Sequence, residues 1–72
     1  MIFPYKTIVC YVDGVPVYHK VGYCDSGETK PTGSDATYIA DGSILTESNT
    51  GDVYFYNKLS DAWGYMFTFK EA

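Results

Sequence analysis

Apolar and polar residues alternate along most of this chain, with the period of two that is typical of β-strands. No stretch longer than one turn shows a helical period, and Gly, Asp, Asn and Ser cluster between the alternating segments. We therefore predict one all-β domain over residues 1–72. It should form a small antiparallel sheet of about five strands, either a meander or a partly open barrel. The expected strands are residues 7–12, 15–23, 43–47, 52–56 and 63–70.

The first hairpin is expected to turn at Asp13-Gly14, because this dipeptide favours the type I′ turn of two-residue loops. Such a loop fixes the register of the two strands. The face that carries Cys10 and Val17 is the more apolar one and should point toward the core. The expected pairs on that face are Val12 with Val15, Cys10 with Val17, and Ile8 with His19.

The same register makes two further predictions. Pro16 has no N–H to give to a strand on its outer side, so the start of the second strand should be a sheet edge. Cys10 and Cys24 lie too far apart along the hairpin, and on opposite faces, to form a disulfide. Both should be free thiols.

The most distinctive stretch is Asn49–Tyr56, followed by Trp63. Gly51 should supply the turn. In the strand that follows, Val53 and Phe55 should face one way while Tyr54 and Tyr56 face the other. Trp63 is expected to cover one of these faces, and the alternation of its strand would place Trp63, Tyr65, Phe67 and Phe69 together.

Residues 24–41 form a turn-rich segment that is long for so small a domain. Segments of this kind have a function or are mobile connections. The sequence leaves two roles open for it, a contact surface or a plain crossover between strands.

Thirteen aromatic rings, from eight Tyr, four Phe and one Trp, are more than a small core can cover. Some should lie at the surface, where Tyr and Trp are enriched in protein interfaces. We expect them to contact copies of this chain, another protein or both. The expected interface residues are Tyr18, Tyr54, Tyr56 and Tyr65. The expected structural residues are Asp13, Gly14, Gly51, Val53, Phe55 and Trp63.

The formal net charge is −4, from nine acidic residues and five lysines with no arginine. A nucleic-acid partner is not expected, because phosphate binding needs clustered Lys and Arg. The acidic residues are scattered, as on an ordinary solvated surface. No apolar run reaches the length of a membrane span and no signal peptide is apparent, so no membrane partner is expected.

Candidate chemistry is sparse. Cys10 and His19 should be diagonal neighbours on one face, but no third group or oxyanion site is evident to complete a catalytic dyad. One histidine and two separated cysteines cannot make a four-ligand zinc site. Asp35 and Asp41 lack the spacing of a calcium loop. We therefore expect neither enzyme activity nor a metal or other cofactor.

Between residues 22 and 67, the chain carries one pattern whose core is a Thr-Gly led by Asp or Asn, then a β-branched and aromatic strand, then a Trp after a polar loop. The segments that make up the whole pattern are Gly22-Tyr23-Cys24, Thr29-Lys30-Pro31-Thr32, Asp41-Gly42-Ser43, Thr46-Glu47, Asn49–Tyr56 and Trp63. The pattern resembles a hairpin module of tailed-bacteriophage and prophage proteins, found in tail-fibre and virion-associated proteins.

This resemblance implies phage origin more strongly than any task. The expected function is a non-enzymatic structural or protein-interaction module of a phage particle, acting through exposed aromatic surface. The alternative is a phage-encoded anti-defence protein, either an anti-CRISPR-type inhibitor or a nucleotide-messenger sponge. The implied location is the host cytoplasm during synthesis and, for a structural module, the virion.

Overall fold

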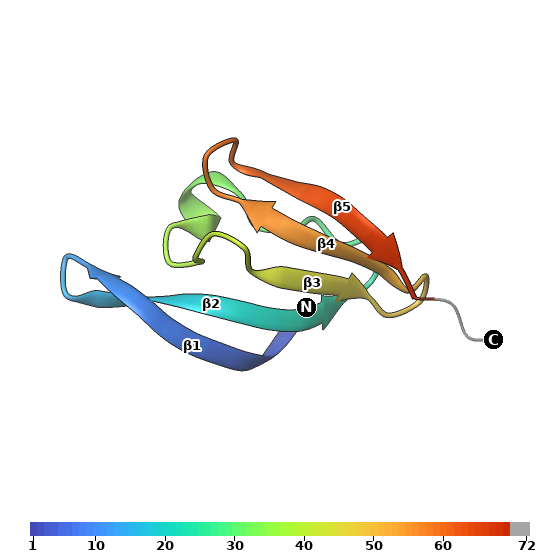
Figure 1. The fold of residues 1–72 in the computed structure, drawn as a ribbon, viewed down its shortest axis with the longest axis horizontal. Helices are drawn as coiled ribbons and strands as arrows, with labels where there is room; N and C mark the ends of the chain where they lie inside the picture. The colour runs from blue at the N-terminus through green and yellow to red at the C-terminus, as the bar shows by residue number, and fades with distance from the viewer. Residues whose placement is uncertain (70–72) are drawn as a thin grey trace.

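In the computed structural model, which describes residues 1–69, the chain forms one open sheet of five strands (Figure 1). The strands are hydrogen-bonded in sequence order, and the sheet does not close into a barrel. The all-β fold predicted from the sequence is confirmed. The elements are β1 (Ile2–Val12), β2 (Val15–Cys24), the 3₁₀ turn η1 (Gly33–Ala36), β3 (Ile44–Glu47), β4 (Asp52–Asn57) and β5 (Ala62–Thr68).

One junction departs from the predicted antiparallel pattern. β1–β2, β3–β4 and β4–β5 are antiparallel, but β3 runs parallel to β2, with Val21 beside Ile44 and Cys24 beside Glu47. Parallel neighbours need a crossover, because the chain must return to the end of the sheet where it began. Residues 25–43 make that crossover. Of the two roles left open for this segment, the crossover is therefore the one that the fold requires.

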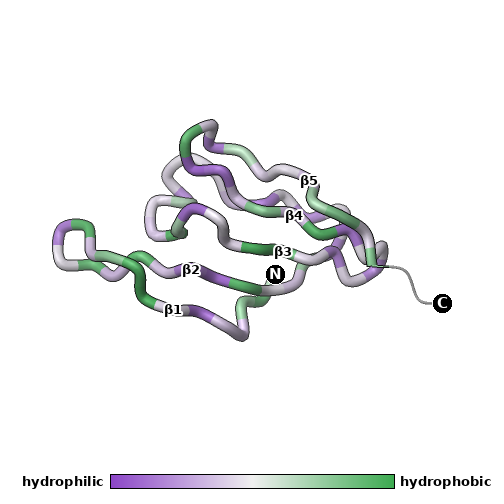
Figure 2. The backbone as a smooth tube through the Cα atoms, in the orientation of Figure 1, coloured by the Kyte–Doolittle hydropathy of each residue, from purple (hydrophilic) through white to green (hydrophobic). Residues whose placement is uncertain are grey.

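The crossover packs against one face of the sheet and closes the core. Ala36 and Ile39 are buried against Tyr56, and Trp63 packs at the rim of this cluster. Figure 1 shows the segment passing behind β3 and β4. In Figure 2 the apolar start of β3 lies at the centre of the sheet, and Leu45 there is fully buried. The buried apolar residues are Val17, Cys24, Ala36, Ile39, Ala40, Leu45, Val53 and Tyr56.

The first hairpin turns as predicted, with positive φ at Asp13 (51°) and Gly14 (78°). The pairs Val12–Val15 and Cys10–Val17 are also as predicted. Beyond Cys10 the register shifts, so that Ile8 faces Tyr18 and His19 faces Thr7. The predicted Ile8–His19 pair is therefore wrong, because a β-bulge adds one residue to β1.

The tip of this hairpin extends beyond the rest of the sheet (Figure 1), which contributes to a molecule of 45 × 22 × 17 Å. Val17 is buried, but Cys10 opposite it is exposed, so only β2 contributes to the core from the face predicted to be apolar. Both cysteines are free, as predicted. On the outer side of β2 the first hydrogen bond is made by Tyr18 with Tyr38, so Pro16 lies at a sheet edge, also as predicted.

The second hairpin has the predicted turn and faces, with one correction. Gly51 has a φ of 79°, and a Cβ there would lie 2.6 Å from the Phe69 carbonyl oxygen. Trp63 pairs with Tyr56, on the face opposite Val53 and Phe55. However, Phe67 pairs with Val53, and not with the Trp63 side. A bulge at Met66 causes this change of face. The predicted strand ran to Lys70, which lies outside the described residues, and β5 ends at Thr68.

Candidate functional site

The two faces of the sheet differ sharply, because the crossover covers only one of them. On the covered face, Trp63 donates its indole N–H to the Pro31 carbonyl at 2.7 Å, and the Asp61 carboxylate accepts the Gly33 amide at 2.8 Å. The Lys58 ammonium donates to the carbonyls of Ala36, Thr37 and Ile39 at 2.9–3.2 Å. These bonds hold the crossover against the sheet.

A second anchor of the crossover is the ion pair between Lys30 and Glu47, at 3.0 Å and largely buried. The Lys30 ammonium also lies 4.1 Å from the centroid of the Tyr54 ring, a cation–π contact. On this side of the sheet Leu45 is fully buried and its pairing partner Tyr54 is half-buried.

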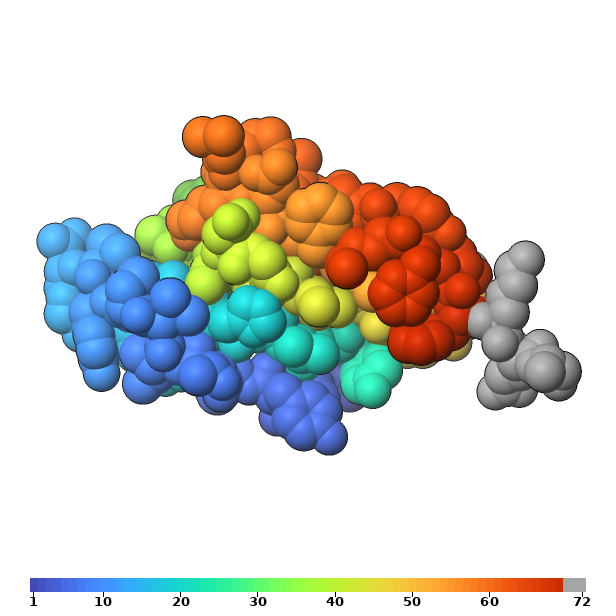
Figure 3. Space-filling model, in the orientation of Figure 1, coloured from blue at the N-terminus to red at the C-terminus, as the bar shows by residue number. Residues whose placement is uncertain are grey.

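The opposite face, which we term the open face, has no covering segment among residues 1–69. Figure 3 views this side of the molecule, where rings from β1, β4 and β5 lie at the surface. Its members follow from the strand registers, in which paired residues share a face. They include Tyr5, Val21, Tyr23, Ile44, Thr46, Val53, Phe55 and Phe67, with Phe69 packed against Phe67.

Four aromatic rings of the open face are exposed, whereas Val53 between them is buried. The exposed fractions of Tyr5, Tyr23, Phe67 and Phe69 are 67%, 44%, 43% and 62%. Phe67 and Phe69 meet edge to face, with their ring centroids 5.0 Å apart. The Phe55 ring lies against Gly64, where an added Cβ would be only 2.8 Å from it. The rings thus lie on a paired sheet and pack on one another, so they present a preformed surface.

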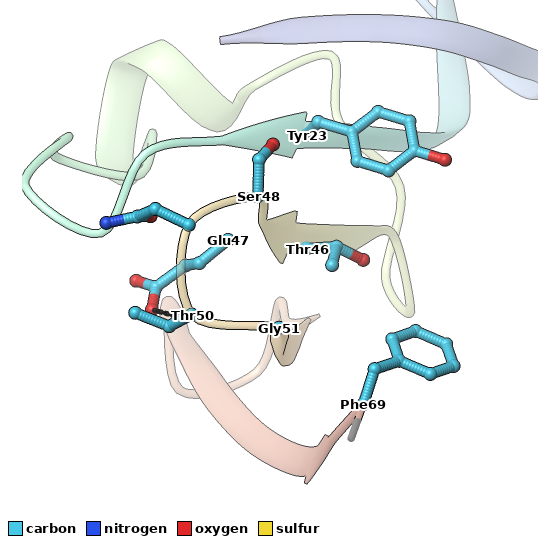
Figure 4. Close-up of a pocket in the computed structure, with 8 residues that line it drawn as sticks. Tyr23, Thr46, Glu47, Ser48, Thr50, Gly51 and Phe69 are labelled. Carbon is cyan, nitrogen blue, oxygen red and sulfur yellow. Dashed lines mark hydrogen bonds between the residues drawn. The ribbon is translucent and has the colours of Figure 1, made fainter. Parts of the chain in front are cut away.

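Tyr23 and Phe69 border a hollow of about 400 Å³ at the end of β3. In Figure 4 their rings extend to the same side as Thr46, while Glu47 points the other way, toward the covered face. The hollow is wide open to solvent, and Ser48 and Asn49 add polar groups at its rim. It gives the open face a concave end.

The residues named for the open face carry no charge. None of them is Asp, Glu, Lys or Arg, whereas the chain as a whole has a net charge of −4. Depletion of charge together with enrichment of aromatic residues is the composition of the centre of a protein interface.

Away from the open face, two contacts between ionisable groups shift the pKa values of those groups. The Tyr56 hydroxyl donates to Asp61 at 2.6 Å, which raises the pKa of Tyr56 to about 12 and lowers the pKa of Asp61. The N-terminal ammonium of Met1 lies 2.9 Å from Glu28, which raises the pKa of the ammonium and lowers that of Glu28. Both contacts are structural links within the chain.

The predicted interface tyrosines have different environments. Tyr56 is only 2% exposed and belongs to the core, so its assignment to an interface is wrong. The crossover buries it, which the sequence pattern did not indicate. Tyr54 and Tyr18 are half-buried, beneath Lys30 and Lys6 respectively. Tyr65 is exposed, but it lies on the Tyr54 side and its hydroxyl contacts Thr68 at 2.5 Å. None of these four lies on the open face.

The residues that sequence reasoning missed are Tyr5, Tyr23, Phe67 and Phe69. Tyr23 pairs with Thr46, on the side of the sheet opposite Tyr54. Its exposure could therefore be predicted from strand alternation, but only once residues 25–43 are known to cover the Tyr54 side. Phe67 had no such signal, since its face depends on the bulge at Met66.

The side chain of His19 has a partner outside the possible catalytic pair. The bulge in β1 places His19 opposite Thr7, and the His19 Nε2 atom lies 2.8 Å from the Gly42 carbonyl oxygen. Within residues 1–69 no group of three or more His, Cys, Asp or Glu side chains is arranged to hold a metal ion. The absence of enzyme activity stays a prediction.

A scan against protein-family models finds no match, and neither do searches of curated proteins and of solved structures. Within residues 1–69, no helix has the length and apolar character needed to cross a membrane.

Proposed function

We propose that this chain is a non-enzymatic interaction module whose open face binds another protein, as a structural component of a bacteriophage particle. The observation that supports this is the open face itself, with exposed rings on paired strands, no Asp, Glu or Lys among its named residues and no covering segment in the described chain. Monomeric proteins rarely leave a contiguous apolar patch of this kind without a partner.

The phage setting of the proposal rests on the resemblance of residues 22–67 to hairpin modules of tailed phages. In such a particle, the open face would pack against a neighbouring virion protein. The hollow beside Tyr23 and Phe69 would receive one apolar side chain of that neighbour.

The second candidate is a phage-encoded inhibitor that covers a surface of a host defence protein. The net charge of −4 favours it, because acidic surroundings of a neutral patch speed association with a basic protein. A nucleotide-messenger sponge has less support. Its rings would have to stack on bases, but Tyr56 is buried against Trp63, with 5.3 Å between ring centroids.

Affinity capture from infected cells tests the proposed surface. We expect the tagged wild-type chain to retain one main partner, and the double variant Tyr23→Ser, Phe67→Ser to retain at least about tenfold less, as loss of two interface rings implies. Tyr38→Ser is the matched control, because Tyr38 is 42% exposed, close to the 44% of Tyr23, but lies in the crossover.

The partner's identity separates the two functions. A virion protein supports the structural module, and a defence protein supports the inhibitor. Equal capture by the wild type and the double variant, with both folded by circular dichroism, would overturn the proposed role of the open face.

A further inference from the structure

The outer edge of β1 is a second unpartnered surface, distinct from the open face. β1 pairs with β2 on one side, and no strand among residues 1–69 pairs on its other side. Every side chain from Pro4 to Val12 is exposed, including Ile8, Val9 and Tyr11. A long apolar edge strand with free N–H and C=O groups is a template for pairing with another strand.

The hydrogen bonds of β2 show which backbone groups of β1 point outward. The Tyr18 amide donates to the Tyr38 carbonyl, and the Lys20 amide donates to Ser43 Oγ, so both residues direct their backbone away from β1. In an antiparallel ladder, the residue opposite such a position also directs its N–H and C=O away. Ile8 lies opposite Tyr18 and Lys6 opposite Lys20, so both present free groups at the outer edge.

Two features restrict pairing to a short segment. Pro4 has no N–H, and the bulge between Ile8 and Cys10 interrupts the regular ladder. The usable edge therefore runs from Tyr5 to Ile8 and contains Thr7, the midpoint of β1. Its two outward residues, Lys6 and Ile8, flank Thr7 symmetrically.

This symmetry fits a second copy of the same chain. In an antiparallel pair centred on Thr7, Lys6 of each copy lies opposite Ile8 of the other copy. The outward N–H and C=O groups of Lys6 then face those of Ile8, which gives about four hydrogen bonds between the two strands. The two Thr7 residues then form a close pair without hydrogen bonds between them.

The distribution of charge also favours a second copy at this edge. β1 contains one charged side chain, Lys6, and no acidic residue, whereas all nine acidic residues lie at position 13 or later. Two chains of net charge −4 can therefore meet along β1 without an acidic side chain of that strand in the contact. The Lys6 ammonium is turned back over the Tyr18 ring of its own chain, at 5.1 Å, which leaves the edge accessible.

We propose that two copies of this chain pair antiparallel through the outer edges of β1, about a two-fold axis at Thr7. The axis lies perpendicular to the sheet, so both open faces end on the same side of one continuous sheet. The dimer is independent of the partner proposed for the open face, and would offer that partner two adjacent copies of it.

Cross-linking tests this register. In a Cys10→Ser background, where Cys24 is buried, Thr7→Cys places two thiols within disulfide range across the axis. We expect a Thr7→Cys dimer to form at least about tenfold faster than a dimer of Thr29→Cys, an exposed control in the crossover. Equal rates for the two variants would contradict the pairing.

Molar mass by light scattering tests the pairing without a cysteine. Ile8→Pro removes an N–H that β2 does not use, so it should leave the fold intact and weaken dimerisation by more than about tenfold. The double variant Tyr23→Ser, Phe67→Ser should keep the dimer mass, which separates this interface from the open face. A wild-type chain that stays monomeric at high concentration, or a folded Ile8→Pro variant that dimerises like the wild type, would overturn the proposal.

Discussion

Single residues, and not long apolar runs, hold the crossover on the sheet. The Tyr56 hydroxyl donates to Asp61, and the same carboxylate accepts the Gly33 amide at the start of η1. Asp61 has a φ of 53°, an uncommon conformation for a residue other than glycine, and this places its carboxylate between the two donors. The sequence predicted Tyr56 as an interface residue, because a pattern of alternation cannot show that a distant segment will fold over it.

Replacing Tyr56 with Phe tests this link. We expect Tyr56→Phe to lower the free energy of unfolding by about 1 kcal/mol at neutral pH, because one hydrogen bond to a carboxylate is lost. Tyr54→Phe is the control, since it makes the same substitution on the same strand and no hydrogen bond from the Tyr54 hydroxyl appears among the described residues.

The pH dependence of this difference has a definite sign. The pKa of Tyr56 is raised from 10.0 to about 12, so its neutral, hydrogen-bonded form stabilises the fold below pH 10 and that contribution is lost toward pH 12. Denaturant unfolding across this range should show the wild type and Tyr56→Phe converging. A difference that stays constant up to pH 12 would contradict the link.

At the scale of elements, the start of β1 lies unusually close to β2. A Cβ on Gly22 would collide with the Ile2 carbonyl oxygen and would lie 2.8 Å from the Phe3 Cα atom. The neighbouring atoms are backbone, so they cannot move aside as a flexible side chain would. Gly22 therefore allows β1 to run close against the buried end of β2.

Gly22→Ala should lower the free energy of unfolding by about 3 kcal/mol, as overpacking against backbone does. Gly27→Ala is the matched control, because a Cβ there meets nothing within 4 Å, and its effect should stay within about 0.5 kcal/mol. Thermal unfolding followed by circular dichroism measures both. Similar melting temperatures for the two variants would show that β1 does not pack on Gly22.

The hairpins were predictable from the sequence because their signals are local. Asp13-Gly14 and Gly51 need positive φ, and both turns form where these residues occur. The bulges between Ile8 and Cys10 and at Met66 have no such signature. The first changes the partner of His19, and the second moves Phe67 to the other face of the sheet. The parallel β2–β3 junction was also missed, since it depends on the crossover binding back to the sheet through Lys58 and Trp63.

At the scale of the whole molecule, one crossover is too short to cover two faces. It buries Leu45 and Tyr56 on one side and leaves the rings of Tyr23 and Phe67 exposed on the other. The sequence predicted exposed aromatic rings that serve as an interface, but the tyrosines that it named for this role lie on the other side of the sheet from the open face. The open face was not identifiable without knowing which side the crossover takes.

Hydroxyl-radical footprinting of Tyr23 and Tyr38, read by mass spectrometry, tests most directly whether the open face is the binding surface. The two rings have nearly equal exposure in the free chain, 44% and 42%, so they should be oxidised at similar rates. In the complex with the captured partner, we expect Tyr23 to be protected several-fold while Tyr38 keeps its rate. Protection of Tyr38 with Tyr23 unchanged would contradict the account.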